Sequence, residues 1–263
     1  MNKFKRNLKI FFLFSKYSLR TTLQARLGII VFILGKIIRF ATLFFFIYLI
    51  FIRTKGFQGY NLNQALIIYM TFNIVDTTSQ ILFREVYRFR YLITSGRFDL
   101  VLTRPYHPFL QILIGGIDFM DIFLLLPYFA ITIFLVIKGG YFHLINLVVY
   151  LFYLVVGLVI ATAFHILILT FGIITTVVDH TILIYRDLTA VGRFPIEIYQ
   201  EPIRFIFTFV FPIALMTNVP AQILIGKNQG NLFVYGFIFA ITLLLISLWV
   251  WQMALKRYQS YGG

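Results

Sequence analysis

Three aspartates, Asp76, Asp118 and Asp121, lie inside long apolar runs, where an ionisable group is costly and usually functional. Asp118 and Asp121 are one helical turn apart, so on a helix they would share a face near the middle of their run. Carboxylates placed in this way could carry protons or cations across a membrane. The sequence therefore allows a proton- or ion-coupled secondary transporter that uses these three residues.

Two basic residues, Lys36 and Arg39, offer the aspartates a different role. Both lie inside the apolar run 27–52, and taken alone their long side chains are expected to snorkel toward the cytoplasmic interface. If the helices pack together, Lys36 or Arg39 could instead form ion pairs with the aspartates. We favour structural pairing over ion transport, because several partners are available.

The sequence contains no set of residues typical of a catalytic centre. It has no cysteine, and the spacing of its His, Asp and Glu residues does not resemble a metal site. The Gly-Lys pairs at 35–36 and 226–227 lack the flanking residues of a phosphate-binding loop. No Ser, His and acid order suggests an intramembrane hydrolase. We therefore expect a protein that is not an enzyme and holds no metal or cofactor of its own.

The composition indicates a membrane protein. Of 263 residues, 60% are hydrophobic and only 12% are charged, whereas soluble domains carry about 25% charged residues. The net charge of +14 would suggest nucleic acid in a soluble protein, but here the basic residues lie mainly at the ends of apolar runs. Long unbroken runs favour helices over barrel strands. We expect an all-α polytopic protein in the lipid bilayer, with one domain over 1–263 and no nucleic-acid partner.

The apolar runs predict six transmembrane helices, at residues 27–52, 64–83, 109–137, the two halves of 144–185, and 232–254. Residues 144–178 contain no formally charged side chain. As one helix they would be longer than the bilayer is thick, so we divide them into a hairpin near 161–165. Residues 1–27 hold seven basic residues and no acid, which predicts a cytoplasmic interfacial elbow helix. Proline-broken apolar pieces predict outer re-entrant helices at 186–230. The distribution of Lys and Arg places both termini in the cytoplasm.

The segment 84–108 is long for a turn between two spans and is rich in arginine. Residues 86–93 can form a short helix that Gly96 ends as a C-cap glycine. Contact with anionic lipid would explain the arginines, but aromatic, aliphatic and Arg side chains together favour docking of a soluble subunit. The residues expected on this coupling segment are Arg84, Val86, Arg88, Gly96, Phe98, Asp99, Leu102, Arg104 and Pro105.

Two segments resemble the permease subunits of type 2 ABC transporters, in the six-span branch typical of bacterial multidrug exporters. One is SGRFDLVLTRPYHP at 95–108, and the other is RFPIEIYQEPIRFIFTFVFPIALMTNVPAQILIG at 193–226. The resemblance implies a half-transporter that pairs with itself or with a second permease. It also implies separate cytoplasmic ATPase subunits, which would bind ATP and Mg and drive export across the inner membrane.

The resemblance also implies roles for particular segments. The elbow helix and residues 84–108 would receive the motion of the ATPase. The outer re-entrant gate would contain Phe194, Pro195, Tyr199, Pro212, Pro220 and Ala221. Candidate pathway residues are Phe44, Phe45, Phe46, Asp76, Thr77 and Thr78.

Overall fold

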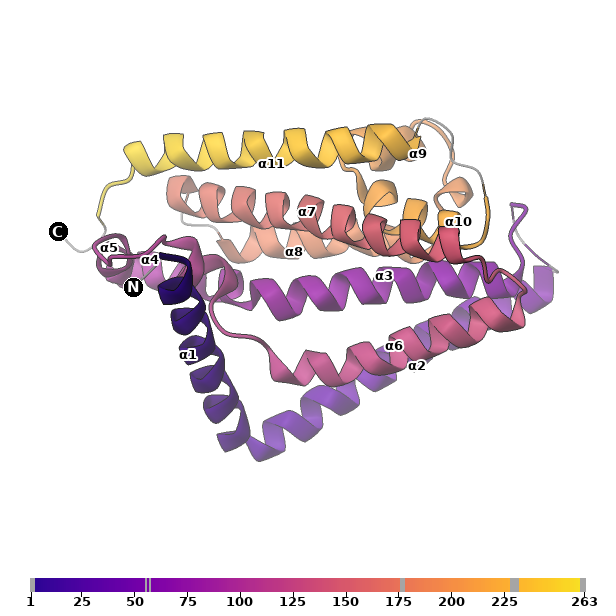
Figure 1. Cartoon of the computed structure of the whole chain (residues 1–263), viewed down its shortest axis with the longest axis horizontal. Helices are drawn as coiled ribbons and strands as arrows, with labels where there is room; N and C mark the ends of the chain where they lie inside the picture. The colour runs from indigo at the N-terminus through magenta and orange to yellow at the C-terminus, as the bar shows by residue number, and fades with distance from the viewer. Residues whose placement is uncertain (1–2, 55, 57, 176–177, 228–231, 261–263) are drawn as a thin grey trace.

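The computed structural model describes residues 3–54, 56, 58–175, 178–227 and 232–260, and all of its elements there are helical. Most long helices run side by side along the horizontal axis of Figure 1, while α1 crosses them steeply at one end. The long helices are α1 (Lys3–Gln24), α2 (Arg26–Thr54), α3 (Leu62–Phe83), α6 (Phe119–Lys138), α7 (Leu144–Thr175), α8 (Val178–Thr189) and α11 (Leu232–Lys256).

Five helices in the described part are long and apolar enough to cross a membrane: α2, α3 with its extension to Thr94, α6, α7 and α11. A bent pair, Ile203–Val210 and Ala214–Leu224, makes a sixth crossing if its two arms count as one span. The arms meet at 73°, as in a broken span or a re-entrant loop. The chain is therefore an all-α polytopic membrane protein, as the composition predicts.

Short helical pieces gather toward the two ends of the bundle. Figure 1 shows α4 and α5 at the left end, close to the start of α1 and the end of α11, and α9 and α10 toward the right end. At the left end the pieces are η1 (Arg84–Arg88), α4 (Phe89–Thr94), α5 (Arg97–Leu102) and η2 (Leu110–Ile114). The later pieces are η3 (Ala190–Arg193), η4 (Ile196–Ile198), α9 (Ile203–Phe205), η5 (Ile206–Val210), η6 (Ala214–Asn218) and α10 (Val219–Leu224). Residues 228–230 of the predicted re-entrant region lie outside the described residues.

The prediction of a hairpin near residues 161–165 is wrong, because α7 continues without a break for 32 residues. At about 1.5 Å per residue this helix is roughly 48 Å long. Its interior polar side chains bond back to the preceding turn, as Thr162 Oγ1 donates to the Leu158 carbonyl at 2.7 Å. The buried His165 ring likewise lies 2.7 Å from the Ala161 carbonyl. The polar side chains at the predicted turn are thus satisfied within the helix.

The third predicted span, 109–137, begins later than expected, because α6 starts only at Phe119. Gly115 has a positive φ of 51°, and Gly116 lies against the Phe14 carbonyl of α1, where a Cβ would be only 2.5 Å from that oxygen. Ser18 Oγ of α1 donates to the Ile117 carbonyl at 3.0 Å. The elbow helix therefore packs on the break that precedes α6.

Asp118 and Asp121 consequently lie at the start of α6 rather than near the middle of a span. Asp118 is the N-cap, and its side chain accepts a hydrogen bond from the Met120 amide at 3.1 Å. The predicted position near the middle of a span is therefore wrong for both residues, because Asp118 precedes the first turn of α6 and Asp121 lies in that turn.

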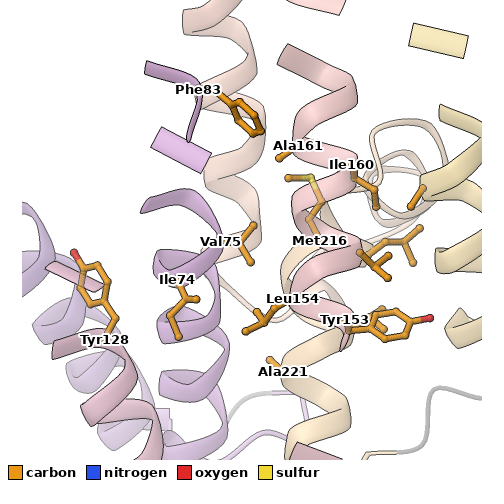
Figure 2. Close-up of a cluster of buried hydrophobic side chains, with 14 of the residues drawn as sticks. Ile74, Val75, Phe83, Tyr128, Tyr153, Leu154, Ile160, Ala161, Met216 and Ala221 are labelled. Atoms are coloured by element: carbon orange, nitrogen blue, oxygen red, sulfur yellow. The ribbon is translucent and has the colours of Figure 1, made fainter. Parts of the chain in front are cut away.

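The bent pair packs against α7. Figure 2 shows Met216 of η6 beside Ile160 of α7. It also shows Leu154 of α7 between Val75 of α3 and Ala221 of α10. Gly157 permits this closeness, because a Cβ there would lie 2.6 Å from the Met216 carbonyl oxygen. The bent pair is thus held by main-chain proximity to the longest span.

Candidate functional site

The coupling segment folds back on itself around Phe98. This side chain is fully buried, and its ring packs edge-on against those of Phe89 at 5.2 Å and Tyr258 at 5.1 Å. Val86 is buried as well. Gly96 adopts a left-handed conformation with a φ of 67° between α4 and α5, as the sequence predicts for a helix-ending glycine. Phe98 and Val86 therefore hold the segment together from inside.

Asp99 ties α5 to the residues that follow α11. Tyr258 Oη donates to Asp99 Oδ1 at 2.9 Å, and Ser260 Oγ donates to the other carboxylate oxygen. Burial, together with the hydrogen bond and charge of Asp99, raises the pKa of Tyr258 to about 12, so its hydroxyl remains a donor at neutral pH. The sequence analysis missed Tyr258, whose only local signal is an aromatic residue just beyond the basic end of the last span.

The outward surface of the coupling segment carries the remaining side chains. Arg88 pairs with Glu85 at 3.0 Å, and Arg104 donates to Tyr106 and Gln111, each at 2.8 Å. Leu100 is 62% exposed. Pro105 is exposed and Leu102 is half-buried. A protein that docked on this end would meet arginines and Leu100.

A chain of polar contacts, here called the charged seam, joins α6, α2 and α3. Lys36 forms an ion pair with Asp121 and donates to Gln80 Oε1 at 3.1 Å. Gln80 Nε2 donates to Asp76 Oδ2 at 2.8 Å. An Arg39 nitrogen lies 3.7 Å from the same Asp76 oxygen. The seam holds α2 against its neighbours at a depth where ionic groups need partners.

All three aspartates form ion pairs in the structure. Asp118 pairs with Arg84 at 2.9 Å, so every one of them has a basic partner. The pairing predicted with Lys36 and Arg39 is confirmed for Asp121 and Asp76. The expectation that Lys36 snorkels is wrong, because α6 places a carboxylate within its reach. Arg84 was predicted as a coupling residue and was missed as the partner of Asp118.

The candidate pathway residues do not form one group. Phe45 and Phe46 are exposed on α2, while Phe44 packs partly against the core. Thr77 is buried, and Thr78 Oγ1 donates to a carbonyl of its own helix at 2.6 Å. A small cavity beside the seam contains two of the six predicted residues, and it is lined by Lys36, Arg39, Phe40, Asn73, Asp76, Thr77, Gln80 and Tyr128.

The predicted outer gate is organised by a buried amide that the sequence analysis missed. Asn218 Oδ1 accepts from the Ile196 amide at 2.9 Å, and Asn218 Nδ2 lies 3.4 Å from the Gly192 carbonyl. Tyr199 Oη donates to the Val191 carbonyl at 3.2 Å. Of the other predicted gate residues, Phe194 is half-buried and four are buried: Pro195, Pro212, Pro220 and Ala221.

A second polar cluster connects this region to the loop before α3. Gln222 Nε2 donates to Tyr60 Oη and to Glu197 Oε1, both at 2.6 Å. Burial, and then the charge of Glu197, raises the pKa of Tyr60 above its usual value. Lys227 lies over the Tyr60 ring, with its nitrogen 3.2 Å from the ring centroid. The loop, η4 and α10 are therefore linked by side chains far apart in sequence.

Comparison with known proteins gives one family. A family model described as ABC-2 family transporter protein matches residues 37–262. The matched range contains the coupling segment, the bent pair and all of the charged seam except Lys36. No curated protein and no solved structure matches the chain.

Proposed function

Since the chain belongs to the ABC-2 transporter family, we propose that this permease is the membrane-spanning half of an ATP-driven exporter. It pairs with a second permease chain, identical or not, and the substrate pathway lies in that assembly. Separate cytoplasmic ATPase subunits bind ATP and Mg and supply the energy. The chain resides in the inner membrane with both termini in the cytoplasm.

The observation that carries the proposal is the family match over 37–262, which spans the coupling segment and the bent pair. The arrangement in Figure 1 supports it, because the coupling segment and the bent pair lie toward opposite ends of the bundle. A push on α4 and α5 reaches α7 and α11 through the packed rings of Phe89, Phe98 and Trp251. Such a push can bias two arrangements of the bundle.

Single cysteines test this orientation, because the natural chain contains none. Leu100 on α5 is 62% exposed and Phe142, in the turn between α6 and α7, is 60% exposed. In intact cells we expect a membrane-impermeant maleimide to label Phe142→Cys and to label Leu100→Cys only after permeabilisation. Leu100→Cys should also cross-link to a soluble ATPase, whereas Phe142→Cys serves as the matched control.

Labelling of Leu100→Cys from outside intact cells would contradict the proposed orientation. Equal cross-linking of the ATPase to both cysteines would contradict the proposed docking end.

A further inference from the structure

Two arginines of the bundle lack a full set of acidic partners. Arg39 of α2 has a side chain that is 49% exposed, and its 3.7 Å separation from Asp76 is longer than a hydrogen bond. Arg193, at the end of η3, is half-buried with its guanidinium 5.2 Å from the centre of the Phe72 ring. Within the described ranges no carboxylate forms an ion pair with Arg193. Neither guanidinium group donates a hydrogen bond to the residues that the structure describes.

Both arginines lie at the depth of the lipid hydrocarbon. Arg39 is near the middle of α2, roughly 20 Å from either end at about 1.5 Å per residue. Arg193 lies at the level of Phe72, which is about 15 Å from the start of α3. A half-exposed guanidinium at this depth is costly against lipid chains and normally faces a water-filled path or a polar partner. The face with Arg39 and Arg193 therefore belongs on the pathway side of the assembly.

Basic groups outnumber acidic groups in this region. Arg39 lies 3.7 Å from Asp76, and Arg193 lies over Phe72, which is about one helical turn from Asp76 on α3. Lys36 is matched by Asp121 in the charged seam, so Asp76 remains to be shared by the others. The basic residues considered are Lys36, Arg39, Arg186 and Arg193. The acidic residues are Asp76, Asp121 and Asp187, the last of which directly follows Arg186.

We propose that Arg39 and Arg193 bind the carboxylate or phosphate group of an amphipathic substrate. This inference rests on the proposed function and adds the chemical class of the molecule carried. Guanidinium groups suit both anions, because their planar N–H donors match two oxygens at once. The apolar part of the substrate has a contact beside Arg39, because half-buried Phe40 lines the same small cavity as Arg39.

A second copy of the chain is the competing source of negative charge. Its Asp76 and Asp121 would be engaged in its own charged seam, as they are here. Asp187 is different, because it is exposed on α8 and no ion pair or hydrogen bond joins it to the described residues. Pairing of Arg39 or Arg193 with Asp187 of a second copy is therefore the alternative that an experiment must separate.

Binding of dodecyl phosphate to the purified full chain in phosphatidylcholine nanodiscs tests the proposal. We expect saturable binding that is about tenfold weaker in Arg39→Gln and in Arg193→Gln, because each loses a charged hydrogen bond. Arg39→Lys should retain part of the affinity. Arg53→Gln, an exposed arginine at the end of the same helix, is the matched control and should bind as the natural chain does. Dodecyltrimethylammonium should not compete.

Nanodiscs with phosphatidylglycerol identify the source of the anion. If phosphatidylglycerol competes with dodecyl phosphate, the site binds a lipid headgroup. If it does not compete, the site binds a dissolved amphipathic anion. Both outcomes support the proposal. Unchanged dodecyl phosphate affinity in folded Arg39→Gln and Arg193→Gln would overturn it. Binding that is seen only after Asp187→Asn would overturn it too, and would assign the arginines to Asp187 of a second copy. The assay needs no ATPase, so it can fail while the proposed function stands.

Discussion

Replacing Asp121 with leucine should destabilise the folded chain by about 3–5 kcal/mol, because it leaves Lys36 without its counter-charge. The Asp121 side chain is 2% exposed and that of Lys36 is 20% exposed, so water screens the pair poorly. Gln80 is the other hydrogen-bond acceptor of Lys36 and is neutral. Reversible unfolding in mixed micelles of dodecyl maltoside and dodecyl sulfate measures the loss.

The double variant Lys36→Met/Asp121→Leu separates the cost of an unpaired charge from the value of the pair. It should regain most of the lost stability, since replacing both partners removes the buried charge. Arg90→Gln is a matched control, because Arg90 and Asp179 form an ion pair at 2.7 Å in which both side chains are exposed. That change should cost at most about 1 kcal/mol. A double variant as unstable as Asp121→Leu would show that the seam does not act as an ion pair.

Replacing Gly157 with valine should push the bent pair away from α7 and lower stability by about 1–3 kcal/mol. The obstruction is the main chain at Met216, whose carbonyl oxygen would be 2.6 Å from the new Cβ and cannot rotate away like a side chain. Leu215 is fully buried in the natural chain. Maleimide labelling of Leu215→Cys should therefore be slow in the natural background and faster with Gly157→Val.

Gly35→Ala is the control for this substitution. Gly35 lies in a long helix like Gly157, but a Cβ there meets nothing within 4 Å. We expect unchanged labelling of Leu215→Cys and a small gain in stability, of up to about 1 kcal/mol, from better helix propensity. If Gly157→Val labelled no faster than Gly35→Ala, the bent pair would not depend on its contact with α7.

The helical membrane fold could be predicted from the sequence, because apolar length and low charge leave the helix as the element that satisfies its backbone in lipid. The helix ends could not all be predicted. Residues 144–178 were divided because the run exceeds the bilayer thickness, yet α7 continues unbroken to Thr175, with Thr162 and His165 bonded to the preceding turn. The start of α6 depends on the approach of α1 to Gly116, which involves residues far apart in sequence.

The candidate sites, like the fold, could be predicted only in part from the sequence. The conformation of Gly96 follows from local turn preference, and the pairing of Asp76 and Asp121 follows from the cost of unpaired charge. That Phe98 points inward, and that Asp99 binds Tyr258, depends on how α11 ends beside α5. Arg193 is the first residue of the segment 193–226, but its position over Phe72 requires the packing of η3 on α3. The sequence therefore predicted which segments form the candidate sites better than it predicted which residues those segments contact.

Affinity purification of the chain in mild detergent, with mass spectrometry of its partners and an ATPase assay, tests the central claim most directly. We predict recovery of a P-loop ATPase subunit and vanadate-sensitive ATP turnover. Recovery of the chain alone, without nucleotide turnover but with proton-dependent flux after reconstitution, would contradict the claim. That result would favour a secondary transporter in which Asp76, Asp118 and Asp121 carry the coupling ion.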